Sequence, residues 1–248
     1  MAIMMMSSIS VGATEKADSL SRANSRYRFK AKELIIPGTL IAVGASSLFF
    51  SPMKDLDKSI QKDMIDLRGN HNRIKLDEYL RYVPTAINIS LSIAGKKAKY
   101  SNIDRILIKA TSIATMYTLT QGLKHTISRT RPDGSDNHSF PSGHTAGVFL
   151  GAESLRQNYG NWWGLAGYTA ATATAFLRLY NNRHWLGDVI SGAGIGILSA
   201  RAGYWLLPLE KKIFGLDKKK ELGSTSMVAL PTYNISNNSF GMTLALQF

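Results

Sequence analysis

Residues 178–188 read RLYNNRHWLGD and connect two apolar stretches of helical length. Within this segment His184 and Asp188 are four residues apart. If a helix begins near Trp185, the carboxylate at position 188 lies in its first turn, where it can accept a hydrogen bond from the imidazole at 184. Such a bond fixes the tautomer of the ring and leaves its other nitrogen free to act as a nucleophile. The helix macrodipole also favours acidic residues in a first turn, so Asp188 has a purely structural explanation too.

The apolar stretches along the chain predict an all-α protein. They cover residues 34–50, 84–95, 103–122, 145–155, 164–180 and 189–207. In the third stretch the apolar residues recur at the spacing of one helical face. They are Ile103, Ile106, Leu107, Ala110, Ile113 and Ala114. We therefore expect a helical bundle of about six core helices.

The last part of the chain has a different pattern. Met242, Leu244, Leu246 and Phe248 alternate with smaller or more polar residues. This alternation is typical of a β-strand with one buried face, and it predicts a short C-terminal β-hairpin. The expected organisation is an N-terminal leader or surface segment at residues 1–32, a helical domain at residues 33–220 and the hairpin tail at residues 221–248.

The chain is strongly basic and lacks cysteine. Its 248 residues contain 30 Lys and Arg against 17 Asp and Glu, which gives a formal net charge of +13. Such a charge attracts polyanions, and nucleic acid, an anionic membrane surface and phosphorylated metabolites all satisfy it. The absence of cysteine excludes disulfides, thiolate zinc sites and a cysteine nucleophile. His71, His125 and His138 show no metal-ligand spacing, so we expect no metal.

Two of the apolar stretches, residues 34–50 and 189–207, are candidates for insertion into a membrane. The first carries no charge but is at the lower limit of spanning length, and Pro37 interrupts its start. A mean hydropathy of −0.08 is low for a chain that crosses a bilayer many times. We expect a compact helical domain that touches a membrane or is shallowly anchored in it, with a polytopic protein as the alternative. Residues 1–13 are either part of an export signal that starts further upstream or a disordered tail.

Two further clusters carry side chains suited to anion chemistry. Residues 124–132, KHTISRTRP, place Lys and Arg at the end of a predicted helix, where cations also serve to meet the macrodipole. Residues 140–145, FPSGHT, form a turn before another predicted helix, with Ser142 as a reasonable N-cap. Exposed N–H groups at such a helix start bind anions, and Gly143 lets a phosphate approach closely. An ordinary capped helix explains the second cluster equally well when it is taken alone.

The three clusters together, in this order, resemble the type 2 phosphatidic acid phosphatase (PAP2) superfamily, which includes bacterial class A acid phosphatases and vanadium-dependent haloperoxidases. The family pattern is Lys, six residues, Arg-Pro; then Pro-Ser-Gly-His; then Ser-Arg, five residues, His, three residues, Asp. Every spacing is met between residues 124 and 188. One position departs from the pattern, because Leu177 stands where the family usually has serine before the arginine.

The resemblance implies a role for each matching residue. His184 attacks phosphorus in line, Asp188 orients its ring, and His144 protonates the leaving oxygen. The non-bridging phosphate oxygens are held by Lys124, Arg131, Ser142, the N–H of Gly143, and Arg178. Three cations and a helix N-terminus supply the positioning and charge stabilisation that phosphoryl transfer requires, without a metal or other cofactor.

The resemblance predicts a metal-independent phosphatase that acts through a phosphohistidine. We expect the substrate to be a phosphorylated lipid, such as a phosphatidate, a prenyl pyrophosphate or a lipid A phosphate. The enzyme is expected in the cell envelope, facing the periplasm and associated with the membrane, without nucleic acid or an obligate protein partner. One alternative is a soluble periplasmic acid phosphatase of broad specificity. Another is a non-enzymatic basic protein that binds a membrane surface or nucleic acid, although no nucleic-acid fold signature is present.

Overall fold

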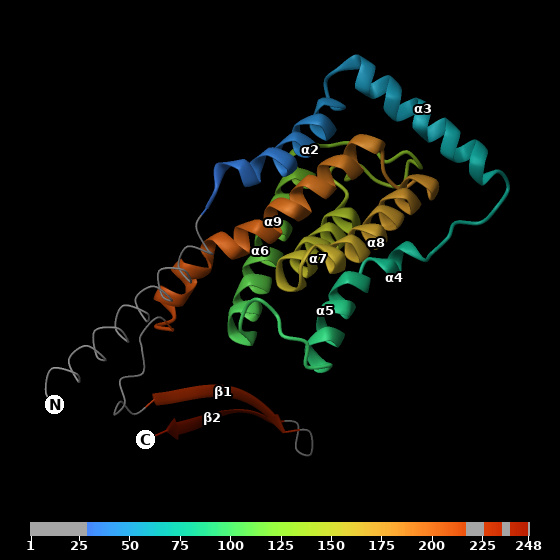
Figure 1. Cartoon of the computed structure of the whole chain (residues 1–248). Helices are drawn as coiled ribbons and strands as arrows, with labels where there is room; N and C mark the ends of the chain where they lie inside the picture. Colours follow the sequence, from blue (N-terminus) through green and yellow to red (C-terminus); the bar gives the residue numbers. More distant parts are fainter. Residues whose placement is uncertain (1–28, 217–225, 235–238, 248) are drawn as a thin grey trace, which may run out of the picture. The chain divides into compact units, whose positions relative to one another are not determined.

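A computed structural model of the chain describes residues 29–216, 226–234 and 239–247 (Figure 1). The leader or surface segment expected at residues 1–32 lies almost entirely outside this part. The chain forms two compact units, of which the first ends at Pro208 and the second starts at Leu209. The domain boundaries expected at residues 33 and 221 stay predictions.

Residues 29–216 are helical. They contain the 3₁₀-helix η1 (Ala31–Leu34) and the α-helices α2 (Ile35–Ser46), α3 (Ser51–Arg68), α4 (Asp77–Leu80), α5 (Val83–Ile93), α6 (Asn102–Thr126), α7 (Gly143–Tyr159), α8 (Asn161–Tyr180) and α9 (Leu186–Ile213). Two strands, β1 (Ser226–Asn234) and β2 (Ser239–Gln247), belong to the second unit and pair with each other in antiparallel register.

The prediction of the fold class was wrong in the number of helices. It assumed about six core helices, whereas residues 29–216 contain eight α-helices. The additional ones, α3 and α4, come from polar segments that a search for apolar stretches passes over. Residues 29–216 contain no β-strand, and β1 and β2 lie outside this helical body.

Helix α7 lies at the centre of the first unit. It packs most extensively against α8 and also contacts α4, α5 and α6 (Figure 1). Val148, Ala152 and Ala171 form a buried cluster between α7 and α8, with Phe149 and Tyr168 packed against it. Burial of this apolar surface is the main driving force for pairing the two helices.

Helix α9 approaches its neighbours very closely because its sequence is rich in small residues. A Cβ atom added at Gly196 would overlap the carbonyl oxygen of Ala146 on α7, and one added at Gly203 would overlap that of Ile108 on α6. On another face, Gly194 lies against the backbone of α2 at Pro37. Most residues of α9 are buried, as such close backbone packing requires.

The order of the helices brings four helix ends together. Helices α6 and α8 end where α7 and α9 begin, because residues 127–142 and 181–185 connect each pair at the same end of the unit (Figure 1). Two C-terminal turns and two N-terminal turns therefore surround one region.

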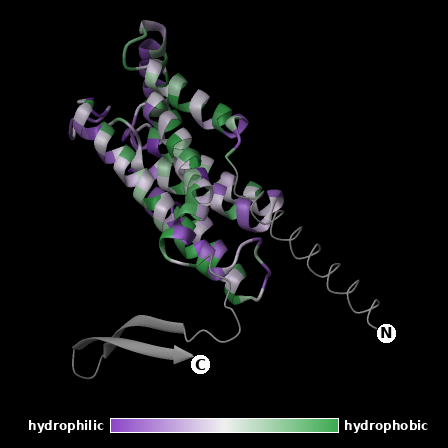
Figure 2. Ribbon diagram, turned by 90° about the vertical axis from the view of Figure 1, so that its left-hand side faces the viewer, coloured by the Kyte–Doolittle hydropathy of each residue, from purple (hydrophilic) through white to green (hydrophobic). Residues whose placement is uncertain are grey.

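Apolar side chains are also exposed on the outer surface. Hydrophobic residues recur along most of the helices in Figure 2. Ile93 on α5, Ile106 on α6 and Trp162 on α8 are 82%, 68% and 85% exposed. None of the described helices has by itself the length and apolar composition to cross a membrane; residues 31–46 and 51–68 meet that criterion only as a pair, bent by 86°.

The close packing of α9 predicts a position-specific effect of a single methyl group. Gly196→Ala should lower the free energy of unfolding by about 1–3 kcal/mol, because the added methyl has no room against α7. The matched control is Gly147→Ala on α7, where a Cβ meets nothing within 4 Å. That change should raise the stability by about 0.5–1 kcal/mol, because alanine is the better helix former. Chemical denaturation of the two variants measures both effects, and similar values for them would contradict the packing.

Candidate active site

The three sequence clusters meet at the four helix ends. Lys124 lies in the last turn of α6 and Arg178 in the last turn of α8. Ser142 is the N-cap residue of α7, which begins at Gly143. Asp188 lies in the first turn of α9, and the remaining predicted residues, Arg131, His144 and His184, lie in or beside the connecting segments. The structure thus brings together all eight residues that the sequence singled out.

The His184 side chain is buried and held in one orientation. Its Nδ1 lies 2.9 Å from the carbonyl oxygen of Ser139. A carbonyl can only accept, so Nδ1 carries the hydrogen and the neutral ring has a free lone pair on Nε2. That nitrogen lies 3.3 Å from Nη1 of Arg131. Burial lowers the pKa of His184 to about 4, against the opposing effect of Asp188, so the ring is neutral at physiological pH.

Asp188 lies next to the His184 ring, but it does not make the direct hydrogen bond to the ring that the sequence suggested. Its Oδ2 lies 3.6 Å from Nδ1 of His184. The carboxylate accepts hydrogen bonds from the Ser139 hydroxyl and from the backbone N–H of Trp185, the latter at 3.0 Å. Ser139 is therefore placed to contact both the ring and the acid.

Arg129, whose side chain is partly buried, joins Asp188 to a second acid. Arg129 donates from Nη1 to Asp188 at 2.6 Å and from Nη2 to Asp57 on α3. Asp57 also accepts the backbone N–H of Gly187 at 2.9 Å. Burial by itself raises the pKa of Asp188, but the contact with His184 and the charge of Arg129 outweigh burial, so the pKa is lowered. The acid is ionised at neutral pH.

His144 faces the same region from the first turn of α7. Its Nε2 lies 2.8 Å from Nη1 of Arg81. A guanidinium can only donate, so Nε2 is the acceptor and the ring is neutral in this state. Burial, followed by the charges of Arg178 and Arg81, lowers the pKa of His144 to about 3. Burial is thus a larger cause of the low pKa than the neighbouring cations.

The three predicted phosphate-binding cations are close enough to influence each other. Burial and the charge of Arg131 lower the pKa of Lys124 to about 8. The Nε of Arg131 donates to both carboxylate oxygens of Asp136 at 2.8 Å. Arg178 is buried and donates to Asp77 at 2.5 Å, whereas its buried Nε has no partner within the described residues. A cluster of cations with an unsatisfied buried donor is suited to binding an anion.

The turn before α7 adds backbone donors to this cluster. Ser142 is fully buried, and its own N–H donates to the backbone carbonyl of Asp188 at 3.0 Å. Its hydroxyl accepts from Thr145 at 2.9 Å instead of capping the helix. A Cβ added at Gly143 would meet nothing within 4 Å. The first amides of α7 lie at the positive end of the helix, which favours negative charge.

Several residues of the site were not found by reading the sequence. They are Asp57, Asp77, Arg81, Arg129, Asp136 and Ser139. Arg129 falls inside the first cluster, where it was read only as one of several cations near a helix end. The acids at 57 and 77 lie in polar segments that carry no motif, so only their burial identifies them.

Fold and site together define an α-helical protein with two neutral histidines beside a group of cations. Among the described residues, no three His, Asp or Glu side chains are grouped as a metal site. Residues 105–212 match the family model of the PAP2 superfamily. The family match and the three motif clusters thus agree.

Three curated relatives are similar to the chain. A lipid A 1-phosphatase of Porphyromonas gingivalis is 33% identical over 211 residues, which are 82% of this chain and 46% of the relative. Two lipid A 1-phosphatases from Helicobacter pylori strains are 29% and 27% identical, each over 49% of this chain and 66% and 65% of their own length. The chain thus spans about half the length of the first relative.

Two solved structures also show similarity. LpxE of Aquifex aeolicus has 22% identity and a TM-score of 0.44, over 57% of this chain and 92% of its own. A transmembrane PAP2 type phosphatidylglycerolphosphate phosphatase from Bacillus subtilis has 19% identity and a TM-score of 0.45, over 75% of this chain and 98% of its own.

The contact between Arg81 and His144 predicts a measurable pKa change. Arg81→Gln removes a cation that disfavours the imidazolium, so the pKa of His144 should rise from about 3 towards the ordinary range. Burial remains, so the rise should be partial. A pH titration of the imidazole signals by NMR measures the change. Arg73→Gln serves as the control, because Arg73 pairs with Asp133 and not with His144. An unchanged titration in Arg81→Gln would show that this contact does not govern the ring.

The depressed pKa of His184 predicts a loss of stability in weak acid. Between about pH 6.5 and pH 4 an unfolded histidine takes up a proton, whereas the folded ring, with a pKa of about 4, stays neutral. The unfolded state then binds more protons, so the free energy of unfolding falls as the pH decreases, by up to about 1.4 kcal/mol per pH unit for this residue.

Replacing His184 should remove its contribution to the pH dependence of the free energy of unfolding. His184→Asn cannot titrate, so its stability between pH 7 and pH 5, measured by urea denaturation, should change less than that of the wild type. His71→Asn, which replaces an exposed histidine, should keep the wild-type slope. Parallel curves for the wild type and His184→Asn would contradict the assignment.

Proposed function

We propose that the chain is a phosphatase that hydrolyses the phosphate ester or pyrophosphate of a lipid through a phosphohistidine on His184. The observation that carries this proposal is the state of the His184 ring. Its Nδ1 donates to the Ser139 carbonyl, and its unprotonated Nε2 accepts a hydrogen bond from Arg131 at 3.3 Å. A neutral, oriented imidazole next to several cations is the arrangement that attack on a phosphate requires.

The reaction divides into two displacements. In the first, Nε2 of His184 forms a bond to phosphorus while the bond to the leaving oxygen breaks, and His144 donates a proton to that oxygen. Lys124, Arg131 and Arg178, with Ser142 and the N–H of Gly143, stabilise the charge on the non-bridging oxygens. In the second, water attacks phosphorus, His144 accepts its proton, and His184 is released with inorganic phosphate. General acid catalysis of this kind contributes typically about 10² to 10⁴ in rate.

His144 must be protonated before it can act as the acid. In the unliganded structure its ring is neutral and accepts from Arg81. A phosphate dianion bound among Lys124, Arg131 and Arg178 offsets the cations that depress its pKa. Binding of the substrate therefore raises the pKa of His144 and favours its protonated form. Arg81, released from the ring, can bind the same phosphate.

The lipid nature of the substrate rests on two further observations. Apolar side chains such as Ile93, Ile106 and Trp162 are exposed on the outer surface, and such exposure is typical of proteins that contact a membrane or a partner. The three curated relatives are named lipid A 1-phosphatase. We therefore take the 1-phosphate of lipid A as the first substrate to test, and a membrane of the bacterial cell envelope as the place of action.

A phosphate-release panel tests this function. Detergent-solubilised protein is incubated with lipid A, phosphatidate, a prenyl pyrophosphate and a short soluble phosphomonoester. Wild-type protein should release phosphate from at least one lipid at a kcat/KM well above that for the soluble ester. Equal turnover of soluble and lipid substrates would favour the broad-specificity alternative.

The covalent step is tested by trapping. Brief incubation with a ³²P-labelled substrate should leave acid-labile label on the wild type, and His184→Ala should carry none and lose nearly all turnover. His71→Ala is the matched control, because it removes an exposed histidine outside the site and should keep both label and turnover. Label on His184→Ala would exclude His184 as the nucleophile.

A further inference from the structure

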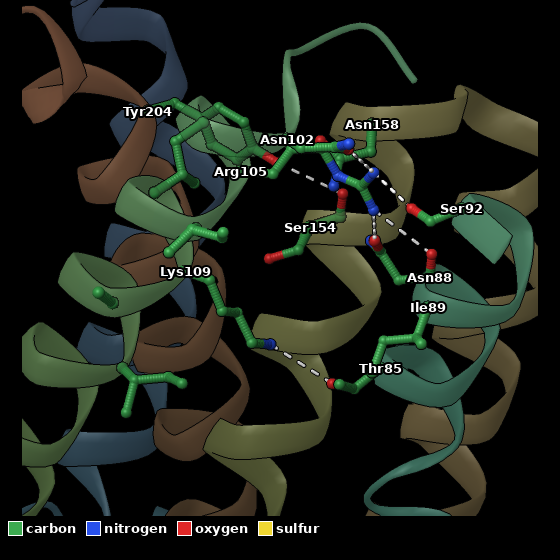
Figure 3. A pocket seen from close by; sticks show the side chains of 14 residues that line it. Thr85, Asn88, Ile89, Ser92, Asn102, Arg105, Lys109, Ser154, Asn158 and Tyr204 are labelled. Carbon is green, nitrogen blue, oxygen red and sulfur yellow. Dashed lines mark hydrogen bonds between the residues drawn. The ribbon is translucent and has the colours of Figure 1, made fainter. Parts of the chain in front are cut away.

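A cavity of about 560 Å³ lies between α5, α6 and α7, apart from the candidate active site (Figure 3). Its volume is that of a small-molecule binding pocket. On α7 it is lined by Ser154 and Asn158, which follow His144 by 10 and 14 residues. At a rise of 1.5 Å per residue this places them about 15 and 21 Å along the helix from His144. The cavity and the candidate active site thus lie towards opposite ends of α7.

The walls of the cavity are apolar at the surface. Helices α5 and α6 each pack against α7, and the space between them remains open. Ile89 on α5 and Ile106 and Ile113 on α6 line this opening and are 55%, 68% and 46% exposed. Three exposed isoleucines at the mouth of one cavity form an apolar surface that a hydrocarbon chain can cover.

The inner part of the cavity carries two positive charges. Arg105 and Lys109 lie one helical turn apart on α6, and no Asp or Glu is among the lining residues. Like charges at this spacing destabilise a helix unless an anion neutralises them. Burial lowers the pKa of Lys109, whose ammonium lies 3.4 Å from the Thr85 hydroxyl.

Arg105 is held in place by neutral groups. Its guanidinium donates to the Ser92 hydroxyl and to the side-chain oxygen of Asn88, both at 2.5 Å. It also lies over the ring of Tyr159, 5.5 Å from the centroid. These contacts orient the guanidinium in the cavity without compensating its charge.

Two buried polar atoms at the cavity have no partner among the described residues. They are Nε of Arg105 and Oγ of Ser154. Ser154 is only 5% exposed, and its side chain points into the space between the three helices (Figure 3). Buried polar groups are normally hydrogen-bonded, so two free ones on opposite walls of one cavity indicate a polar ligand group between them.

We propose that this cavity binds an anionic lipid, separately from the substrate in the active site. The headgroup contacts Arg105, Lys109 and Ser154, and one acyl chain lies along Ile89, Ile106 and Ile113. The charges select an anionic headgroup, and the apolar mouth selects a lipid over a free anion. This site does not depend on the proposed phosphatase activity.

A binding measurement with defined lipids tests the proposal. The full chain, purified in an uncharged detergent, is titrated with phosphatidylglycerol and with phosphatidylcholine of the same acyl chains, and retention of each lipid is followed by native mass spectrometry. Phosphatidylglycerol should bind at least about tenfold more tightly, as expected when a charge-assisted hydrogen bond is gained. Equal retention of the two lipids would overturn the proposal. Displacement of phosphatidylglycerol by millimolar inorganic phosphate would also overturn it, because the site would then recognise a free anion.

Three variants distinguish a loss of lipid binding from a loss of folding. Ser154→Ala and Lys109→Met each remove a buried polar group that has no strong partner, so the unliganded protein should unfold at the same or a higher temperature. Both should nevertheless bind phosphatidylglycerol about tenfold more weakly. Ala110→Trp places a large ring at the cavity, where Ala110 is an exposed lining residue, and should block the lipid without changing charge.

The matched control is Lys97→Met, which removes an exposed lysine outside the cavity. It should bind phosphatidylglycerol as the wild type does. Unchanged binding in all three cavity variants, or an equal loss in Lys97→Met, would show that the lipid is held by the general positive charge of the protein.

Discussion

The ion bridge from Asp57 through Arg129 to Asp188 is the interaction on which the arrangement of the candidate active site depends. It joins α3, the connection between α6 and α7, and the first turn of α9. Both acids are buried, so removal of Arg129 would leave two buried carboxylates without compensation, which is strongly destabilising. Asp188 also contacts Ser139, whose carbonyl orients the ring of His184. The stability of the bridge and the orientation of the proposed nucleophile therefore depend on the same atoms.

The electrostatics of the site follow from where its acids lie. Arg178 is paired with Asp77 and Arg131 with Asp136, while the Nε of Arg178 remains without a partner. The paired acids hold the cations in position, and one donor stays available for an anion. Burial depresses the pKa of both His144 and His184, so neither adds charge in the unliganded state. A phosphate that enters then meets fixed cations and neutral rings, which is the preorganisation that favours phosphoryl transfer.

Helix α7 contributes to two regions with different chemistry. Its first turn supplies His144 and backbone N–H groups to the candidate active site, and its second half lines the cavity between α5 and α6. This is possible because the middle of the helix is held on other sides, by α8 and by the glycines of α9. Close packing on those sides keeps α7 in place, and the spacing of α5 and α6 leaves room for a ligand.

The sequence alone determined the helical class and the eight residues that meet at the helix ends. Both are encoded locally, because helical periodicity and motif spacing depend on residues close together in the chain. It did not reveal α3 and α4, whose polar segments are stabilised by contacts with the rest of the unit. Only the tertiary structure decided that Asp57 pairs with Arg129, that Arg81 contacts His144, and that Arg105 and Lys109 face a cavity. The first of these partners are 72 residues apart in the chain. Burying a charged group costs free energy unless the group is paired. This cost depends on the three-dimensional surroundings of each group and not on its neighbours in sequence.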